Sequence, residues 1–265
     1  MKRLIYLVLL AGILQACRTQ GNSIGQNINL FSIDQDKQLG AQVAHEIDSN
    51  PKEYPVIDSA KNVALYTYMY KVRNLILNSG QVKLKDQFEW RVRVIQNDSV
   101  MNAFCTPGGY IYVYTGILKF LDSEDQLAGV LGHEIGHADM RHSTRQMTQM
   151  YGVQILLDVI AGKHEAIKQI SGAIISLKFS RNHETEADAC SVRYLCPTPY
   201  NADGGAGFFE KIQNLGGAKQ PEFLSTHPDP GNRIEHFHTA KEEQNCQGNN
   251  QFKTEYAQML KLLPK

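Results

Sequence analysis

The sequence predicts an α+β fold, in which many helices surround a small, mostly antiparallel β-sheet. The 265 residues are 42% hydrophobic and 20% charged, an ordinary globular composition at a length that suits one large or two small domains. Apolar residues recur at helical spacing along most of the chain, and two short segments have the alternation or composition of strands. No internal repeat or interdomain linker is evident, so we expect a single domain over residues 31–265.

The charge of the chain is balanced, with 27 Lys and Arg against 27 Asp and Glu. A nucleic-acid-binding protein needs a basic surface to displace counterions from phosphates, and this composition gives no sign of one. We therefore expect no nucleic-acid partner.

Residues 1–16 have the pattern of a signal peptide. Lys2 and Arg3 precede an uncharged run over residues 4–14, which is too short to cross a bilayer ~30 Å thick. The run ends in Leu14-Gln15-Ala16-Cys17, which resembles the lipobox of bacterial lipoproteins, so Cys17 is the expected lipidation site. The alternatives are a plain secretory signal with a chance cysteine, or a buried N-terminal helix.

Residues 17–30 are polar and rich in Gly and Asn, which indicates a flexible tether between the membrane and the domain. Arg18 stands where an acidic residue would resemble an inner-membrane retention signal. The expected location is therefore the periplasmic side of the cell envelope, with the lipid in the outer membrane.

The elements of the domain follow from periodicity. Apolar residues at helical spacing, from Leu39 to Ile47, predict one helix after Ser32, and a second, longer one is predicted through 63–77. The segments 90–95 and 110–114, with a Pro-Gly-Gly turn before the second, predict the sheet. Residues 123–196 are helical in pattern, opening with a capping box at Ser123, and 197–203 end this region. The first of these helices is expected to be apolar on one side.

Four cysteines follow Cys17, at positions 105, 190, 196 and 246. An exported protein meets an oxidising compartment, so disulfides are permitted, and four cysteines allow three complete pairings. We hypothesise that Cys196, next to the helix stop at Pro197, pairs with Cys246 and fastens the C-terminal segment.

The chemistry is concentrated in the sequence His133-Glu134-Ile135-Gly136-His137. Two histidines four residues apart project from one face of a helix and can bind one ion, while Glu134 can reach a water on that ion. Zn²⁺ lowers the pKa of such a water towards ~7, and the neighbouring carboxylate acts as general base in peptide hydrolysis. The alternative is a pair of exposed helix histidines without a ligand.

A third protein ligand is needed for a catalytic zinc site with one open position. Glu184 and Asp188 are also four residues apart on a helical segment. Glu184 would bind the metal, and Asp188 would accept a hydrogen bond from the second nitrogen of a ligand histidine. The alternative for both acids is a solvated helix face. Glu186 is expected to point elsewhere, and His164 and His183 to lie on the surface.

With these motifs the sequence resembles the gluzincin-type metallopeptidases that include HtpX, mitochondrial Oma1 and the CAAX prenyl proteases. The resemblance covers roughly residues 31–240 in collinear order. It rests on four segments: 133–137, 180–188, 102–113 and 225–234. It implies a zincin-type metallopeptidase core with one Zn²⁺ per chain, bound by His133, His137 and Glu184, with Glu134 as general base.

The resemblance also implies roles for four other residues. Asn102 and the backbone at Ala103 would hold extended substrate along an edge strand; a turn residue is the alternative for Asn102. His227 and Arg233 would approach the metal from the opposite wall and stabilise the oxyanion of the tetrahedral intermediate. His227 would alternatively occupy the fourth zinc position and keep the enzyme latent.

The expected function is that of a zinc endopeptidase of the bacterial cell envelope that cleaves misfolded or stalled exported proteins. The alternative is a chaperone-like assembly factor for outer-membrane proteins, with latent protease activity. The expected partners are unfolded or misassembled envelope proteins, the outer-membrane assembly machinery, and the membrane through the N-terminal lipid.

Overall fold

A computed structural model describes residues 28–264 except for 152, 215–220 and 230. The predicted signal peptide, Cys17 and most of the predicted tether lie outside the described residues. In chain order the described elements are α2 (Ile33–Asp48), α3 (Val63–Leu77), β1 (Arg91–Ile95), β2 (Ala103–Thr106), β3 (Tyr110–Tyr114), α4 (Thr115–Phe120), α5 (Glu124–Asp139), α6 (His142–Met150), α7 (Val153–Ile160), α8 (His164–Ile175), α9 (Arg181–Leu195), α10 (Gly204–Asn214), α11 (Phe223–Thr226), α12 (Arg233–Glu243) and α13 (Lys253–Leu260). The predicted helix-rich α+β architecture is confirmed.

The three strands form one mixed sheet with the order β1–β3–β2. β2 and β3 form an antiparallel hairpin, whereas β1 pairs with β3 in parallel. The expected mostly antiparallel sheet is therefore wrong in this respect. The reason is that the chain leaves β1, passes to the far edge to form β2, and returns between them as β3, which then runs in the same direction as β1. β2 is left as an edge strand beside α5.

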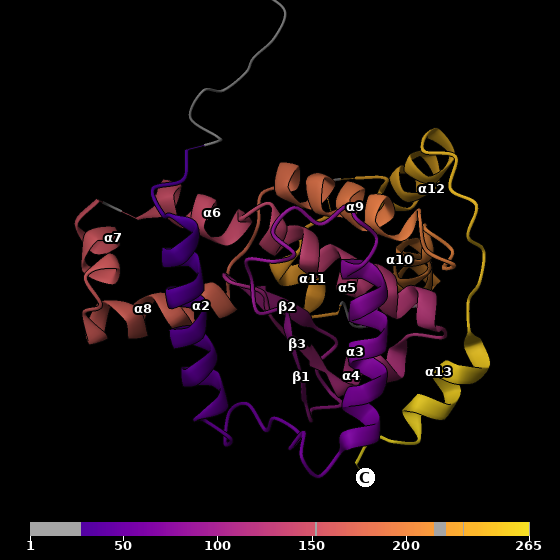
Figure 1. Cartoon of the computed structure of the whole chain (residues 1–265), viewed down its shortest axis with the longest axis horizontal. Helices are drawn as coiled ribbons and strands as arrows, with labels where there is room; N and C mark the ends of the chain where they lie inside the picture. Colours follow the sequence, from indigo (N-terminus) through magenta and orange to yellow (C-terminus); the bar gives the residue numbers. More distant parts are fainter. Residues whose placement is uncertain (1–27, 152, 215–220, 230, 265) are drawn as a thin grey trace, which may run out of the picture.

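Helix α5 lies in the centre of the molecule (Figure 1). Every residue of α5 except Gln126 is buried, its polar residues as well as the predicted apolar side. The helix contacts α3, α9, α10, β2 and β3, which together surround it. A helix buried on all sides needs partners for its polar side chains, and this one carries two histidines and a glutamate.

The start of α5 at Glu124 agrees with the prediction, but the predicted capping box is absent. The Ser123 side chain accepts no bond from the helix and instead donates to Asp125. The amides of Glu124 and Asp125 donate to the backbone carbonyl of Gln251, at 3.0 and 3.4 Å. The C-terminal segment therefore provides the cap that the local sequence was expected to provide.

A second group of apolar side chains lies where α2, α7 and α8 pack beside the sheet, around Leu39, Tyr112 and Ile170. Contacts with α6 begin at Asn29 and Leu30, which bond to Thr144 and Thr148. No helix within the described parts of the chain is long and apolar enough to span a membrane.

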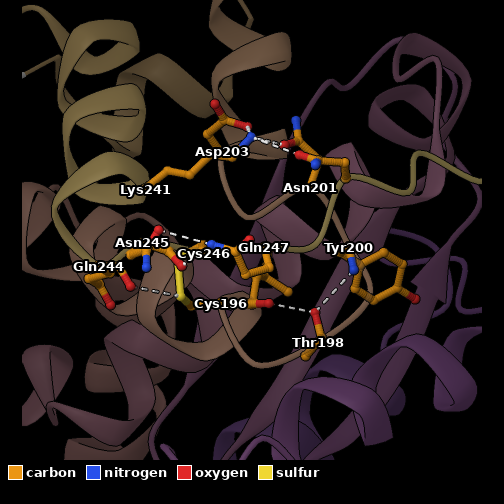
Figure 2. The surroundings of a disulfide bond; sticks show 12 residues. Cys196, Thr198, Tyr200, Asn201, Asp203, Lys241, Gln244, Asn245, Cys246 and Gln247 are labelled. Carbon is orange, nitrogen blue, oxygen red and sulfur yellow. Dashed lines mark hydrogen bonds and ion pairs between the residues drawn. A yellow bond between two sulfur atoms is a disulfide. The ribbon is translucent and has the colours of Figure 1, made fainter.

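The C-terminal region is fastened to the rest of the domain by a disulfide between Cys196 and Cys246 (Figure 2). This confirms the hypothesised pairing. The disulfide joins the end of α9 to the segment after α12, and Lys241 within α12 bonds to Asn201 and Asp203. Cys105 and Cys190 are free thiols in buried positions.

Candidate metal centre

The two histidines of α5 present their Nε2 atoms to the same point. His133 Nε2 and His137 Nε2 are 2.9 Å apart, and both rings are buried. Phe179 stacks on the His137 ring at a centroid distance of 3.9 Å and limits its rotation. Two histidines four residues apart on α5 thus lie on the same face of the helix, as the sequence predicted.

Helix α9 lies against α5 and adds the first carboxylate. The helix begins after Ser180, whose hydroxyl accepts a hydrogen bond from the amide of His183. Glu184 lies one turn into the helix and is fully buried. Its two oxygens lie 3.4 Å from His133 Nε2 and 3.5 Å from His137 Nε2.

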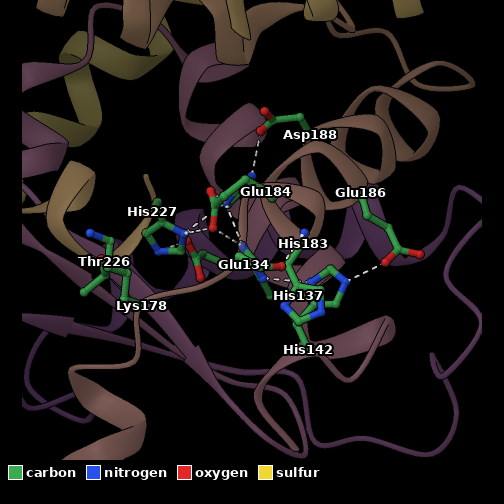
Figure 3. Close-up of polar contacts among 12 residues, drawn as sticks. Glu134, His137, His142, Lys178, His183, Glu184, Glu186, Asp188, Thr226 and His227 are labelled. Atoms are coloured by element: carbon green, nitrogen blue, oxygen red, sulfur yellow. Dashed lines mark hydrogen bonds and ion pairs between the residues drawn. The ribbon is translucent and has the colours of Figure 1, made fainter. Parts of the chain in front are cut away.

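His227 completes the group from a different part of the chain, directly after α11 (Figure 3). Its Nδ1 lies 3.2 Å from both His133 Nε2 and Glu184 Oε1. One ligand atom from each of His133, His137, Glu184 and His227 lies within 4.8 Å of the others. The structure therefore brings together four of the residues singled out in the sequence.

These four residues fit a metal ion chemically. His133 and His137 use their Nδ1 atoms for other contacts, so both Nε2 atoms face the same point, as two ligands of one cation would. Several buried acceptors lack a hydrogen-bond partner among the described residues: both oxygens of Glu134, Oε2 of Glu184 and Nε2 of His227. Buried acceptors without partners are costly, and a divalent cation with a bound water would satisfy the carboxylate oxygens.

The electrostatics of the site follow from burial opposed by close partners. Burial alone would lower the pKa of His133, but hydrogen bonds to Asp188 and Glu184 raise it to about 9. Burial also favours a protonated Glu184, yet His227 and His133 hold the pKa of this carboxyl well below its usual range. For Glu134 burial prevails over the nearby His227 and His133, and its pKa is raised. A raised pKa suits a carboxylate that must accept a proton.

Asp188 lies where the sequence placed it, behind a ligand histidine. Its Oδ1 is 2.8 Å from His133 Nδ1, which fixes the proton of that ring on the side away from the cluster. Arg233, from the start of α12, donates from Nε to Asp188 Oδ2 at 2.8 Å and lies 3.4 Å from Glu184 Oε2. Its guanidinium therefore holds two acidic side chains of α9, and its predicted contact with an oxyanion stays a prediction.

A further set of residues behind His137 was not found from the sequence. His142 Nδ1 lies 2.9 Å from His137 Nδ1, and His142 Nε2 lies 2.9 Å from Glu186 Oε2. Glu186, expected to point elsewhere, thus pairs with a histidine of α6. His183, expected on the surface, is buried and stacks on His142 at 4.3 Å. These contacts join α6 to α9, so no spacing within one helix indicates them.

Asn102 and Ala103 lie at the start of β2, the edge strand that faces α5. Both residues are buried, and Asn102 Oδ1 accepts a hydrogen bond from the amide of Ala103. The residue before them, Met101, accepts a backbone hydrogen bond from Phe223 of α11 at 3.0 Å. The position at an edge strand agrees with the prediction, and the contact with substrate stays a prediction.

Comparison with known proteins decides the family. The family model "Peptidase family M48" matches residues 69–241, a range that contains the four clustered residues, Glu134 and Asp188. The chain belongs to peptidase family M48. This confirms the resemblance drawn from the sequence motifs. Members of this family are metal-dependent peptidases, and the matched range contains the cluster on α5 and α9.

The relatives that the chain matches are named as proteases or metalloendopeptidases. The chain is 29% identical over 215 residues to the mitochondrial metalloendopeptidase OMA1 of Schizosaccharomyces pombe, which covers 79% of this chain and 62% of that protein. It is 30% identical over 147 residues to the metalloprotease YcaL of Escherichia coli, covering 52% and 58%. It is 26% identical over 231 residues to the beta-barrel assembly-enhancing protease of Yersinia pestis, covering 81% and 45%. The matches thus span at most about three fifths of these relatives.

Proposed function

We propose that this protein is a zinc-dependent endopeptidase of the bacterial cell envelope. The observation that carries the proposal is the meeting of His133, His137 and Glu184 around one point, with the Glu134 carboxylate, which makes no hydrogen bond within the described part of the chain, beside it. Two histidines and a glutamate form a common catalytic zinc set. A carboxylate that makes no hydrogen bond to any described residue, and has only His227 Nε2 at 3.5 Å, is available for proton transfer.

The residues would act as follows. Bound Zn²⁺ would polarise the scissile carbonyl and make a water acidic enough to attack it. Glu134 accepts the proton of the attacking water and passes it to the leaving amine nitrogen. Asp188 keeps the proton of His133 on Nδ1, so that Nε2 presents its lone pair to the metal.

Substrate would bind in extended form along β2, with Asn102 and Ala103 at one end. Main-chain hydrogen bonds to an edge strand give affinity with little preference for sequence, which suits the cleavage of misfolded or stalled exported proteins. The beta-barrel assembly-enhancing protease among the relatives supports a connection with outer-membrane protein assembly. A chaperone-like assembly factor with latent activity remains the second candidate for this reason.

We also propose that His227 keeps the site latent. His227 lies within the ligand cluster, and the segment that carries it is bonded to Met101, next to the proposed substrate strand. Opening this segment would free both a metal position and the start of β2. The expected result for His227→Ala is faster cleavage of casein. An unchanged rate would remove this role.

The N-terminal motif supports the proposed location on the periplasmic side of the outer membrane. Cys17 would carry the lipid, and residues 17–30 would tether the domain to the membrane. Globomycin, which blocks lipoprotein signal peptidase, is expected to cause accumulation of the precursor. If the protein has the same size with and without globomycin, lipidation of Cys17 is contradicted.

The test of the central proposal uses purified residues 18–265 and the Glu134→Gln variant. We expect one zinc per chain in both proteins by elemental analysis, and casein cleavage that falls by a factor of about 10²–10⁴ in the variant. Zinc without cleavage in either protein would favour latency or the assembly-factor alternative. The absence of zinc from protein prepared without chelators would contradict the proposal.

A further inference from the structure

We infer that His142 and Glu186 position the metal ligand His137 through a continuous chain of hydrogen bonds. This inference rests on the proposed metal site. It concerns residues that bind neither metal nor substrate, and it deepens the account of that site. The chain runs from the buried ligand to a carboxylate at the surface (Figure 3).

The direction of the hydrogen bonds follows from the position of the ion. The Nε2 atom of His137 faces the other ligand atoms, so it must offer its lone pair to the metal. The remaining nitrogen, Nδ1, then carries the proton and donates to His142 Nδ1 at 2.9 Å. His142 must accept at Nδ1, so its own proton lies on Nε2.

The outer end of the chain accepts that proton. His142 Nε2 donates to Glu186 Oε2 at 2.9 Å, and Arg145 Nη1 lies 3.3 Å from the same oxygen. One carboxylate therefore fixes the tautomers of two histidines. With His137 bound to the metal, this is the assignment in which each contact joins a donor to an acceptor.

The two metal-binding histidines are thus supported in different ways. His133 bonds directly to a carboxylate, that of Asp188 at 2.8 Å. His137 is connected to the carboxylate of Glu186 through the imidazole of His142. Stacked rings also hold the hydrogen-bonded residues His137 and His142 in place, because Phe179 stacks on His137 and His183 stacks on His142. When a ligand histidine donates its second N–H to such an acceptor, the hydrogen bond orients the ring and increases its basicity.

The position of Glu186 makes this chain testable without a change in the core. Its side chain is 37% exposed, while His142 is fully buried. Glu186→Gln removes the charge at the accessible end and keeps the shape of the side chain. His142→Phe removes both ring nitrogens and keeps a flat ring to stack on His183.

The experiment measures zinc affinity by competition with a chromophoric chelator, on folded wild type and on the two variants. Glu165→Gln is the matched control, because it removes the same charge from an exposed position in the first turn of α8. We expect zinc affinity to fall 10- to 100-fold in Glu186→Gln and His142→Phe and to stay unchanged in Glu165→Gln.

A merely structural role would give a different pattern. Urea unfolding of the chelator-treated proteins would then show reduced stability, while zinc affinity stayed at the wild-type value. Equal zinc affinity in wild type and Glu186→Gln would overturn the inference, even if His142→Phe did not fold. A wild-type protein that bound no zinc would overturn both the proposed function and the inferred role of His142 and Glu186.

Discussion

Glu186 is a half-exposed residue whose charge is held by two partners, His142 and Arg145. The hydrogen bond from His142 is the largest influence, and against the effect of burial it lowers the pKa of Glu186 to about 2. In the unfolded chain the same group has its ordinary value of 4.5. A lower pKa in the folded state means that the charged form stabilises the fold.

The sign of the resulting pH dependence is fixed. The stabilisation is complete above pH 4.5 and is lost as the pH falls towards 2. We expect Glu186→Gln to be less stable than wild type at pH 7 by on the order of 1 kcal/mol, after allowance for solvent screening. Urea unfolding at pH 7, 4 and 2.5 measures the difference between the two proteins. A difference that grew on acidification would contradict the assigned pairing.

Arg233 is the residue whose removal is expected to cost most. Its guanidinium is buried, bonds to Asp188 and lies near Glu184, while the Phe209 ring covers it at 4.1 Å. Arg233→Met would leave two buried carboxyl groups without this partner, and the free energy of unfolding should fall by about 3–5 kcal/mol. Denaturant unfolding in excess zinc tests this. A loss below about 1 kcal/mol would mean that other groups neutralise these acids.

At the scale of elements, the metal centre depends on how closely α5 and α9 approach each other. Glycines of α5 face α9, and a Cβ atom on Gly136 would lie 2.9 Å from Cys190 Cβ and 3.2 Å from the Ala187 carbonyl oxygen. The close approach places Glu184 of α9 beside His133 and His137 of α5. Gly136 is therefore required by the packing of α5 against α9.

Two Gly→Ala substitutions separate packing from helix propensity. Alanine is favoured over glycine in a helix by about 1 kcal/mol, and no atom lies within 4 Å of a Cβ added to Gly172 of α8. We expect Gly172→Ala to be neutral or stabilising. Gly136→Ala should destabilise the protein by about 1–3 kcal/mol and weaken zinc binding, because the helices must separate. Thermal unfolding and zinc competition on both variants provide the measurement.

The disulfide provides a second prediction for these elements. It closes a segment with a sequence separation of 50 residues between α9 and the end of α12. Replacing both Cys196 and Cys246 with Ser should lower the free energy of unfolding by about 2–4 kcal/mol. Dithiothreitol should lower the stability of wild type to the level of the double variant and leave the variant unchanged. Equal stability of all samples would show that the bond constrains nothing.

The elements differ in how far the sequence predicts them. The periodicity of residues 39–47 and 63–77 reports a helix that packs one face, and α2 and α3 have the expected positions. The cap of α5 comes from Gln251, more than one hundred residues away, and no local pattern contains that information. For the same reason Glu184 was predictable from its spacing to Asp188 on one helix, whereas the contact of Glu186 with His142 was not.

For the whole molecule, the metal ion would join three separate parts of the fold: α5, α9 and the segment after α11. An ion bound only to the folded state stabilises it according to its concentration relative to the dissociation constant. With free zinc at one hundred times that constant, the free energy of unfolding should rise by about 2.7 kcal/mol. Thermal scans after chelation and after addition of zinc measure this change. His137→Ala is the control, since it should show almost none of the effect.

The ligands also lie far apart along the chain. His133 and His227 are separated by 94 residues, and Arg233 lies 100 residues after His133. A growing polypeptide that ends before Arg233 has α5 and its two histidines but lacks the guanidinium that neutralises Asp188. The four clustered residues His133, His137, Glu184 and His227 can therefore come together only after most of the chain has been made and can fold.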